Sequence, residues 1–207
     1  IGAAKELSKK LNNEEVGVLL LTGNESTDNL LKEISEAGAD KVYLVQDDNL
    51  KCYKTELYAK AVMEAINLKK PSILLIGATT AGRDFAPRVS SILNTGLTAD
   101  CTSLDINEKG LLAATRPTFG GNLMATILCQ NTRPQMATVR PKVLAKPEPD
   151  TANKATVEKL NIKVDPSLAR AEILECAQAI QGHCARIDEA DIIISGGRGM
   201  KNAENFK

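Results

Sequence analysis

Three short and nearly continuous apolar runs constrain the fold of this chain more than any other feature. They read VGVLLL at residues 16–21, KVYLV at 41–45 and SILLI at 72–76. Each run is too short for a core helix and lacks the alternation of a strand with one face in water. Such runs are typical of strands that are buried on both faces of a parallel sheet.

Amphipathic segments with the three-to-four-residue spacing of helices separate these runs. This spacing predicts helices over residues 1–11, 26–37, 53–68 and 85–93. Strands that alternate with helices form βαβ units, in which a parallel sheet is covered by helices on both faces. The predicted fold class is therefore α/β, and ligands of such sheets bind beyond the carboxyl ends of the strands.

The pattern changes after residue 101. Residues 102–106 and 111–115, joined by the turn NEKG, predict a β-hairpin. Residues 123–129 and 135–140 suggest a second pair of strands. The sequence therefore predicts hairpins added to the α/β core.

The last part of the chain is less regular. Residues 141–156 are rich in Pro, Lys and Glu and predict a connector, while residues 169–180 fit a helix or a strand equally well. DIIIS at 191–195 predicts a further buried strand that runs into the glycine turn at 196–199. Because little sequence follows this turn, we expect it to begin a further domain.

Composition argues against several classes of function. The 26 Lys and Arg residues balance the 26 Asp and Glu residues, unlike in phosphate-tracking nucleic-acid binders and polybasic membrane-surface proteins. One histidine speaks against a hydrolytic triad, and five cysteines without C-x-x-C spacing indicate reduced thiols rather than disulfides or a zinc site. No apolar run approaches the roughly 18 residues of a membrane span. We expect a soluble, cytoplasmic protein that binds neither nucleic acid nor membranes.

A loop of small residues follows the third predicted strand. It reads GATTAGRD at residues 77–84 and leads into a predicted helix. Backbone N–H groups beside a helix N-terminus attract anions, and Arg83 would add a positive charge. The alternative interpretation is a tight turn in which Asp84 caps the helix and Arg83 pairs with a carboxylate.

A second candidate segment reads ATRPTFGGN at residues 114–122. Gly120 and Gly121 would let the backbone come close to another group. Arg116, at the end of the predicted hairpin, can reach outward, and a guanidinium beside an isoalloxazine ring stabilises negative charge on a reduced flavin. The alternative is a hairpin turn with a solvated arginine.

Two other segments carry arginine beside Pro or Gly. NTRPQMATVRP at 131–141 has two Arg-Pro pairs, for which we favour a structural role at the ends of a strand. SGGRG at 195–199, with Arg198, fits the phosphates of a dinucleotide as well as it fits a domain hinge. The sequence shows no carboxylate pair for acid–base chemistry, so we predict no catalytic residue and no metal ligand.

Five motifs, in order, resemble the alpha subunit of electron-transfer flavoprotein. They read GATTAGRDFAPR at 77–88, TGLTADCT at 95–102, TRPTFGGN at 115–122, RPQMATVRP at 133–141 and SGGRG at 195–199. The resemblance implies a Rossmann-like parallel sheet of the adenine-nucleotide-hydrolase type with added β-hairpins, in three αβα layers.

The resemblance also implies a division into domains and a partner. Residues 1–187 would form the N-terminal α/β domain without its first strand, and 188–207 would begin the C-terminal FAD-binding domain. Residues 169–176 would be a strand. The partner would be the structurally similar beta subunit.

The cofactors that the resemblance implies depend on the type of flavoprotein. In the ordinary type the beta subunit binds AMP and the heterodimer carries one FAD. In the bifurcating type a second FAD replaces AMP and faces this domain. The string RPTFGG at 116–121 is closer to the bifurcating type than to the ordinary type, in which an RTIYAG-like string is usual.

The implied function is flavin-based electron bifurcation. NADH would be oxidised, with one electron passing to a low-potential acceptor such as ferredoxin and the other to an acyl-CoA dehydrogenase-like partner. Arg116 would lie nearest the flavin, and Phe119, Gly120 and Gly121 would shape its pocket. Arg83 and Arg198 are further candidates for cofactor binding. Whether the chain belongs to an enzyme then depends on the type.

Three alternatives stay open at this point. The first is an ordinary one-FAD electron carrier for acyl-CoA dehydrogenases. The second is a nucleotide-binding regulatory module of the stress-protein kind, against which the hairpins of residues 102–140 speak. The third is a docking scaffold that contacts no ligand, in which case every arginine named above is structural.

Overall fold

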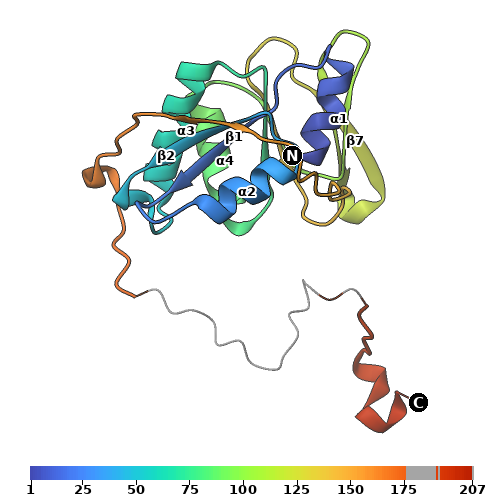
Figure 1. Ribbon diagram of the computed structural model, residues 1–207. Coiled ribbons are helices and arrows are strands. Elements are labelled where there is room, and N and C mark those ends of the chain that lie inside the picture. The colour runs from blue at the N-terminus through green and yellow to red at the C-terminus, as the bar shows by residue number, and fades with distance from the viewer. Residues whose placement is uncertain (176–189, 191, 207) are drawn as a thin grey trace. The chain divides into compact units, whose positions relative to one another are not determined.

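A computed structural model describes residues 1–175, 190 and 192–206 (Figure 1). The chain divides into two compact units, Ile1–Glu172 and Ile173–Lys207. In the described residues, the first unit holds the α-helices and the strands. The second holds two short 3₁₀ helices, η5 (Arg198–Met200) and η6 (Ala203–Asn205). The predicted domain boundary between residues 187 and 188 lies outside the described residues.

The first parallel sheet has the strand order β1-β2-β9. Strands β1 (Gly17–Thr22) and β2 (Lys41–Gln46) form where the apolar runs predict them. Strand β9 (Thr156–Lys159) pairs in parallel with β2 and was not predicted. Its sequence TVEK is charged and largely exposed, so this edge strand has no apolar run to reveal it.

The second parallel sheet has the order β3-β8-β4. It contains β3 (Ile73–Gly77), β8 (Gln135–Val139) and β4 (Leu97–Cys101), of which β4 was not predicted. The predicted pairing of residues 123–129 with 135–140 is wrong, because β8 pairs in parallel with β3 and β4. The physical reason is that most of β8 is buried, as befits the central strand of a covered sheet.

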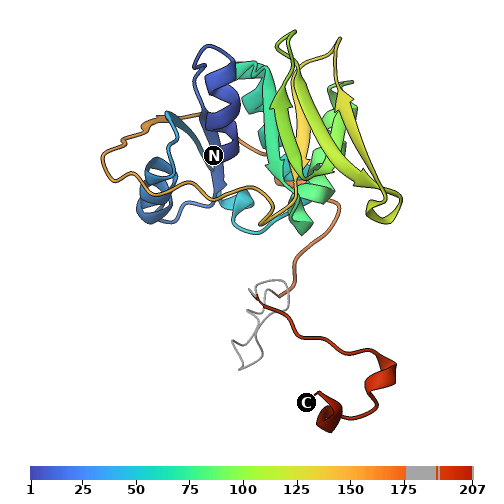
Figure 2. The same cartoon turned by 90° about the vertical axis from the view of Figure 1, so that its right-hand side faces the viewer.

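The third sheet is antiparallel, with the order β5-β6-β7. Strands β5 (Ser103–Ile106) and β6 (Leu112–Thr118) form the predicted hairpin. Strand β7 (Leu123–Leu128) adds a further strand beside β6. Figure 2 shows this hairpin sheet beside the second parallel sheet, which it contacts through β4 and β6.

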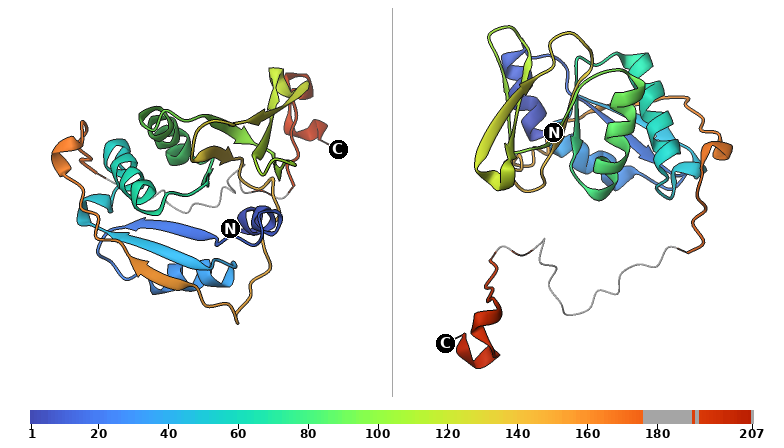
Figure 3. Two further views of the ribbon diagram at one scale, coloured as in Figure 1. Left: turned by 90° about the horizontal axis from the view of Figure 1, so that it is seen from above. Right: turned by 180° about the vertical axis from the view of Figure 1, so that it is seen from behind.

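Helices cover both faces of the parallel strands, as predicted. Helices α3 (Thr55–Lys69) and α4 (Thr80–Ile92) lie on one face (Figure 3). Helices α1 (Gly2–Lys10) and α2 (Asp28–Glu36) lie on the other. The α/β fold class is therefore confirmed, although the parallel strands form two sheets of three strands each.

Side chains of β3 alternate between the two faces of the sheet, so this strand contributes to two core clusters. Leu74 and Ile76 pack with side chains of α3 and α4, whereas Ile73 and Leu75 pack on the opposite face, where Leu7 of α1 is buried. Successive side chains of a strand point to opposite faces, so a continuous apolar run satisfies both layers. Among the described residues, no helix is both long and apolar enough to span a membrane.

Two predicted elements near the C-terminal end are wrong within the described residues. Residues 169–175 form neither a helix nor the strand that the family resemblance implies. Residues 192–195 form no strand, and Ile192 and Ile194 are each 84% exposed. An apolar run becomes a strand only where another strand supplies hydrogen bonds, and no described strand pairs with either segment.

Candidate functional site

The strongest candidate site lies where the strands of the second parallel sheet end. Ala78 follows β3, Asp100 is the last residue but one of β4, and Arg140 follows β8. Because parallel strands end at one edge of a sheet, residues far apart in sequence meet here. We call the cluster of Arg83, Arg116, Arg140 and Asp100 at this edge the arginine edge.

The small-residue loop after β3 is shorter than predicted. Helix α4 begins at Thr80, five residues before the predicted start, and Thr79 caps it by accepting a hydrogen bond from the Gly82 N–H over 3.2 Å. The alternative interpretation, in which Asp84 caps the helix, is therefore wrong about the cap. Its carboxylate accepts hydrogen bonds from Tyr53 and Thr55 instead, so it joins α4 to the start of α3.

Asp100 is the centre of the arginine edge. Arg140 donates two hydrogen bonds to it, from Nη2 to Oδ2 over 2.6 Å and from Nε to Oδ1 over 3.2 Å. The Nη2 atom of Arg83 lies 2.8 Å from Oδ1, and the Nε atom of Arg83 donates to the Ala78 carbonyl. Two guanidiniums from different elements thus share one carboxylate.

The charges around Asp100 keep it ionised. The hydrogen bond from Arg140 is the largest influence, and the positive charges of Arg83 and Arg116 act in the same direction. Together they outweigh partial burial and lower the pKa of the Asp100 carboxyl group. Asp100 is therefore an anion at neutral pH.

Arg116 lies on the core-facing side of the hairpin sheet. It is two residues after Ala114, which is buried, and opposite Ala125 of β7. Its Nε atom is buried and has no hydrogen-bond partner among the described residues. Burial raises the pKa of the neighbouring Cys101 thiol to about 11, although the Arg116 charge opposes that shift. Arg116 is thus a cation with an unused buried donor.

An open hollow of about 420 Å³ lies beside Arg116. Residues 116–121 and Arg140 line it. Phe119 is 81% exposed at its rim, and the turn η2 (Phe119–Gly121) carries Gly120 and Gly121 at φ values of +69° and +93°. Only glycine adopts such angles without strain, so these two residues let the turn close beside the hollow.

The structure brings most of the predicted site residues together. Arg116 and residues 119–121 share the hollow, and Arg83 joins the same edge through Asp100. Arg198 belongs to the second unit, where it begins η5 with an exposed side chain, and its role toward a cofactor stays a prediction.

Sequence reasoning missed Asp100 and Arg140. Asp100 lies in a strand that was not predicted, and the Arg140-Pro141 pair was given a structural role. The signal that could have revealed both is their position at the carboxyl end of a strand in an α/β fold.

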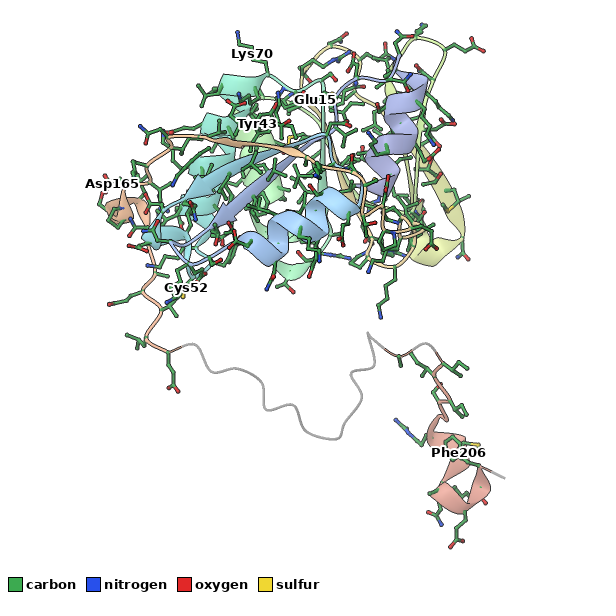
Figure 4. The ribbon with its side chains drawn as sticks, viewed as in Figure 1. Glu15, Tyr43, Cys52, Lys70, Asp165 and Phe206 are labelled. Atoms are coloured by element: carbon green, nitrogen blue, oxygen red, sulfur yellow. The ribbon has the colours of Figure 1, made fainter. Side chains whose placement is uncertain are left out.

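Other polar clusters of the described residues hold the fold together. Around Tyr43 (Figure 4), the Oη atom donates to Glu15 over 3.0 Å, and the Lys69 ammonium lies 4.7 Å from the ring centroid. Lys69 also pairs with Glu158 of β9, so this cluster joins α3 to the first sheet. In the described part of the chain, no group of three or more His, Cys, Asp or Glu side chains could hold a metal ion.

Comparison with known proteins identifies the family. Residues 1–165 match the family model described as the electron transfer flavoprotein domain. The chain belongs to the electron transfer flavoprotein family. The resemblance found in the sequence motifs is thereby confirmed at the level of the family, and the matched region includes the whole arginine edge.

Relatives with curated names support the same family assignment. The electron transfer flavoprotein subunit alpha of Thermoanaerobacterium thermosaccharolyticum is 47% identical over 206 residues, which are 100% of this chain and 61% of the relative. The subunit of the same name from Clostridium acetobutylicum is 44% identical, with 100% and 61% covered. The protein FixB of Azorhizobium caulinodans is 42% identical, with 100% and 56% covered. The chain thus spans about three-fifths of the length of these relatives.

Proposed function

We propose that this chain is part of the alpha subunit of a bifurcating electron transfer flavoprotein, in which the arginine edge faces an FAD bound to the beta subunit. FAD accepts and passes on electrons singly or in pairs, which is the chemistry that such a complex needs. The single observation that carries the proposal is the buried, unpartnered Nε atom of Arg116 beside an open hollow.

The residues of the arginine edge fit a flat, negatively charged group. Three guanidiniums surround one carboxylate, so the edge carries an excess of two positive charges. Arg116 can donate to an acceptor on a planar ring, since its guanidinium is itself planar and always charged. Phe119 at the rim offers an exposed aromatic face, on which a ring system can stack. These residues would hold the ring and stabilise negative charge on it.

The proposal extends to the domains. Residues 1–187 would form the N-terminal domain, and 188–207 would begin the C-terminal FAD-binding domain. In the first relative, 39% of the length (100% minus 61%) lies outside the match to this chain, which leaves room for such a further domain.

Strand β7 is the surface that we propose for the beta subunit. It is an edge strand, and its side chains are largely exposed on both faces. Leu123 and Met124 are 59% and 58% exposed, and Ile127 and Leu128 are exposed as well. An unpaired apolar edge strand invites another chain to cover it. Phe119 lies in the turn just before β7 and also lines the hollow, so a beta subunit that covers β7 would reach the hollow as well.

Replacing Ile127 by Asp tests this surface. We expect the affinity of the full-length alpha subunit for the beta subunit to fall at least tenfold, because a carboxylate would be buried without a partner. Isothermal titration calorimetry or analytical ultracentrifugation measures the dissociation constant. Leu30→Asp on α2 is the matched control, since Leu30 is exposed to a similar degree (45% against 43%). Equal affinities of the two variants would contradict the proposed surface.

The flavin and AMP content of the full-length heterodimer tests the proposed function. We expect two FAD and no AMP per heterodimer, quantified by absorbance and by chromatography of the released nucleotides. Two FAD place a flavin in the beta subunit, as the bifurcating type requires. One FAD with one AMP would instead support the ordinary electron carrier and leave Arg116 a structural residue.

A further inference from the structure

We propose that Asp100 is a positioning residue that fixes the arginine edge and limits its positive charge toward the bound flavin. This inference rests on the proposed function, in which an FAD faces the edge. It concerns a residue that has no contact with the hollow itself, since Asp100 does not line it. Its effect would therefore pass through the arginines and through its own charge.

The backbone holds Asp100 in an unusual conformation. Its φ is +61°, in the left-handed region, where β4 loses register with β8 between Thr98 and Cys101. The Asp100 N–H donates to the Oγ1 atom of Thr138 over 2.8 Å, and Thr138 is 1% exposed. Such an irregularity re-aims a side chain at the end of a strand. Here it turns the carboxylate toward arginines that come from α4 and from the end of β8.

The paired arginines take their positions from this carboxylate. Arg140 is held by two hydrogen bonds and also lines the hollow. Arg83 is held by Asp100 and by the Ala78 carbonyl. Without the carboxylate, the positive charges of these two side chains would repel each other, and the Arg140 guanidinium would lose both of its described hydrogen bonds.

The same carboxylate sets the net charge of the edge. Arg83 and Arg140 are engaged with Asp100, whereas Arg116 has no carboxylate partner among the described residues. Removal of the Asp100 charge would raise the excess from two positive charges to three. In a partly buried site such a change is screened less than at the surface. The added positive charge would favour the reduced state of the bound flavin, because that state is the more negative one.

The experiment is a redox titration of the full-length heterodimer that carries Asp100→Asn. The side chain keeps its shape and loses its charge. We expect the ratio of reduced-state to oxidised-state binding to rise about tenfold for the flavin of the beta subunit, which corresponds to a potential about 30 mV more positive for a two-electron couple. Spectroelectrochemistry of the bound flavins gives this potential without any turnover.

Asp105→Asn is the matched control. Asp105 also forms an ion pair with a cation, Lys10, and its replacement changes the net charge by the same amount. Asp105 lies on β5 and pairs with Lys10 rather than with an arginine of the edge, so we expect no shift in potential. Equal shifts in the two variants would mean a nonspecific charge effect and would overturn the proposal.

A second variant covers the case in which Asp100→Asn does not fold. Arg83→Gln removes a half-exposed positive charge from the same edge, so its potential should move in the opposite direction, toward more negative values. An unchanged potential in both variants, with two FAD present, would overturn the role of Asp100 and leave the proposed function standing. A wild-type heterodimer with AMP in place of the second FAD would overturn both.

Discussion

Replacing Arg116 by Ala is expected to lower NADH-dependent electron transfer by the full-length heterodimer roughly 10- to 150-fold. The factor follows from the roughly 1.5–3 kcal/mol that a hydrogen bond to a charged group contributes. Arg116 has a buried Nε atom without a partner among the described residues, whereas Arg140, which also lines the hollow, is engaged with Asp100 and so does not replace it. Assembly should survive, because the exposed side chains of β7 are unchanged.

Two further variants distinguish the loss of the Arg116 guanidinium from the general effect of removing an arginine. Arg116→Lys keeps the charge but not the planar fork, and we expect it to recover part of the rate. Arg88→Ala removes an exposed arginine that pairs with Glu56 on α3, and we expect wild-type rates from it. Steady-state assays with NADH give the rates, and flavin content and gel filtration check that each heterodimer is loaded and assembled. Unchanged NADH-dependent turnover in Arg116→Ala would sink the assignment.

Replacing Gly82 by Ala is expected to destabilise the fold by about 3 kcal/mol or more. A Cβ atom at residue 82 would lie 1.9 Å from the Gly77 carbonyl oxygen and 3.1 Å from the Gly77 carbonyl carbon. Both are backbone atoms of the strand end, so relief requires α4 to move away from β3. Alanine favours a helix over glycine by about 1 kcal/mol, which is too little to offset this clash.

The melting temperature of the full-length heterodimer measures the effect. A loss of about 3 kcal/mol corresponds to a fall of roughly 6–12 °C for a domain of this size. Gly77→Ala, at the end of β3, is the matched control, because its Cβ atom would meet only Thr79 Cγ2 at an ordinary 3.7 Å. We expect that variant to melt close to the wild type. A Gly82→Ala heterodimer that melts with the wild type would show that α4 is less closely packed on β3 than the structure indicates.

Local sequence patterns were sufficient for strands β1, β2 and β3 and for the helices. The runs at residues 16–21, 41–45 and 72–76 became β1, β2 and β3, because a continuous apolar run can be satisfied only between two covering layers. Motif order was sufficient for the family, and it singled out Arg116 and Arg83 as candidates. Each of these signals is carried by residues that are neighbours in the chain.

Tertiary structure decided the features that depend on residues distant in sequence. The pairing partner of residues 135–139 was mistaken, because hydrogen bonds between strands leave no mark in the sequence of either strand. Asp100 and Arg140 were missed for the same reason, since their ion pair forms only when β4 and β8 end at one edge. The sequence by itself thus determined the helices, strands β1 to β3, the β5–β6 hairpin and the family. The three-dimensional fold determined the arginine edge, because a charge cluster is a property of distances in space rather than of spacing along the chain.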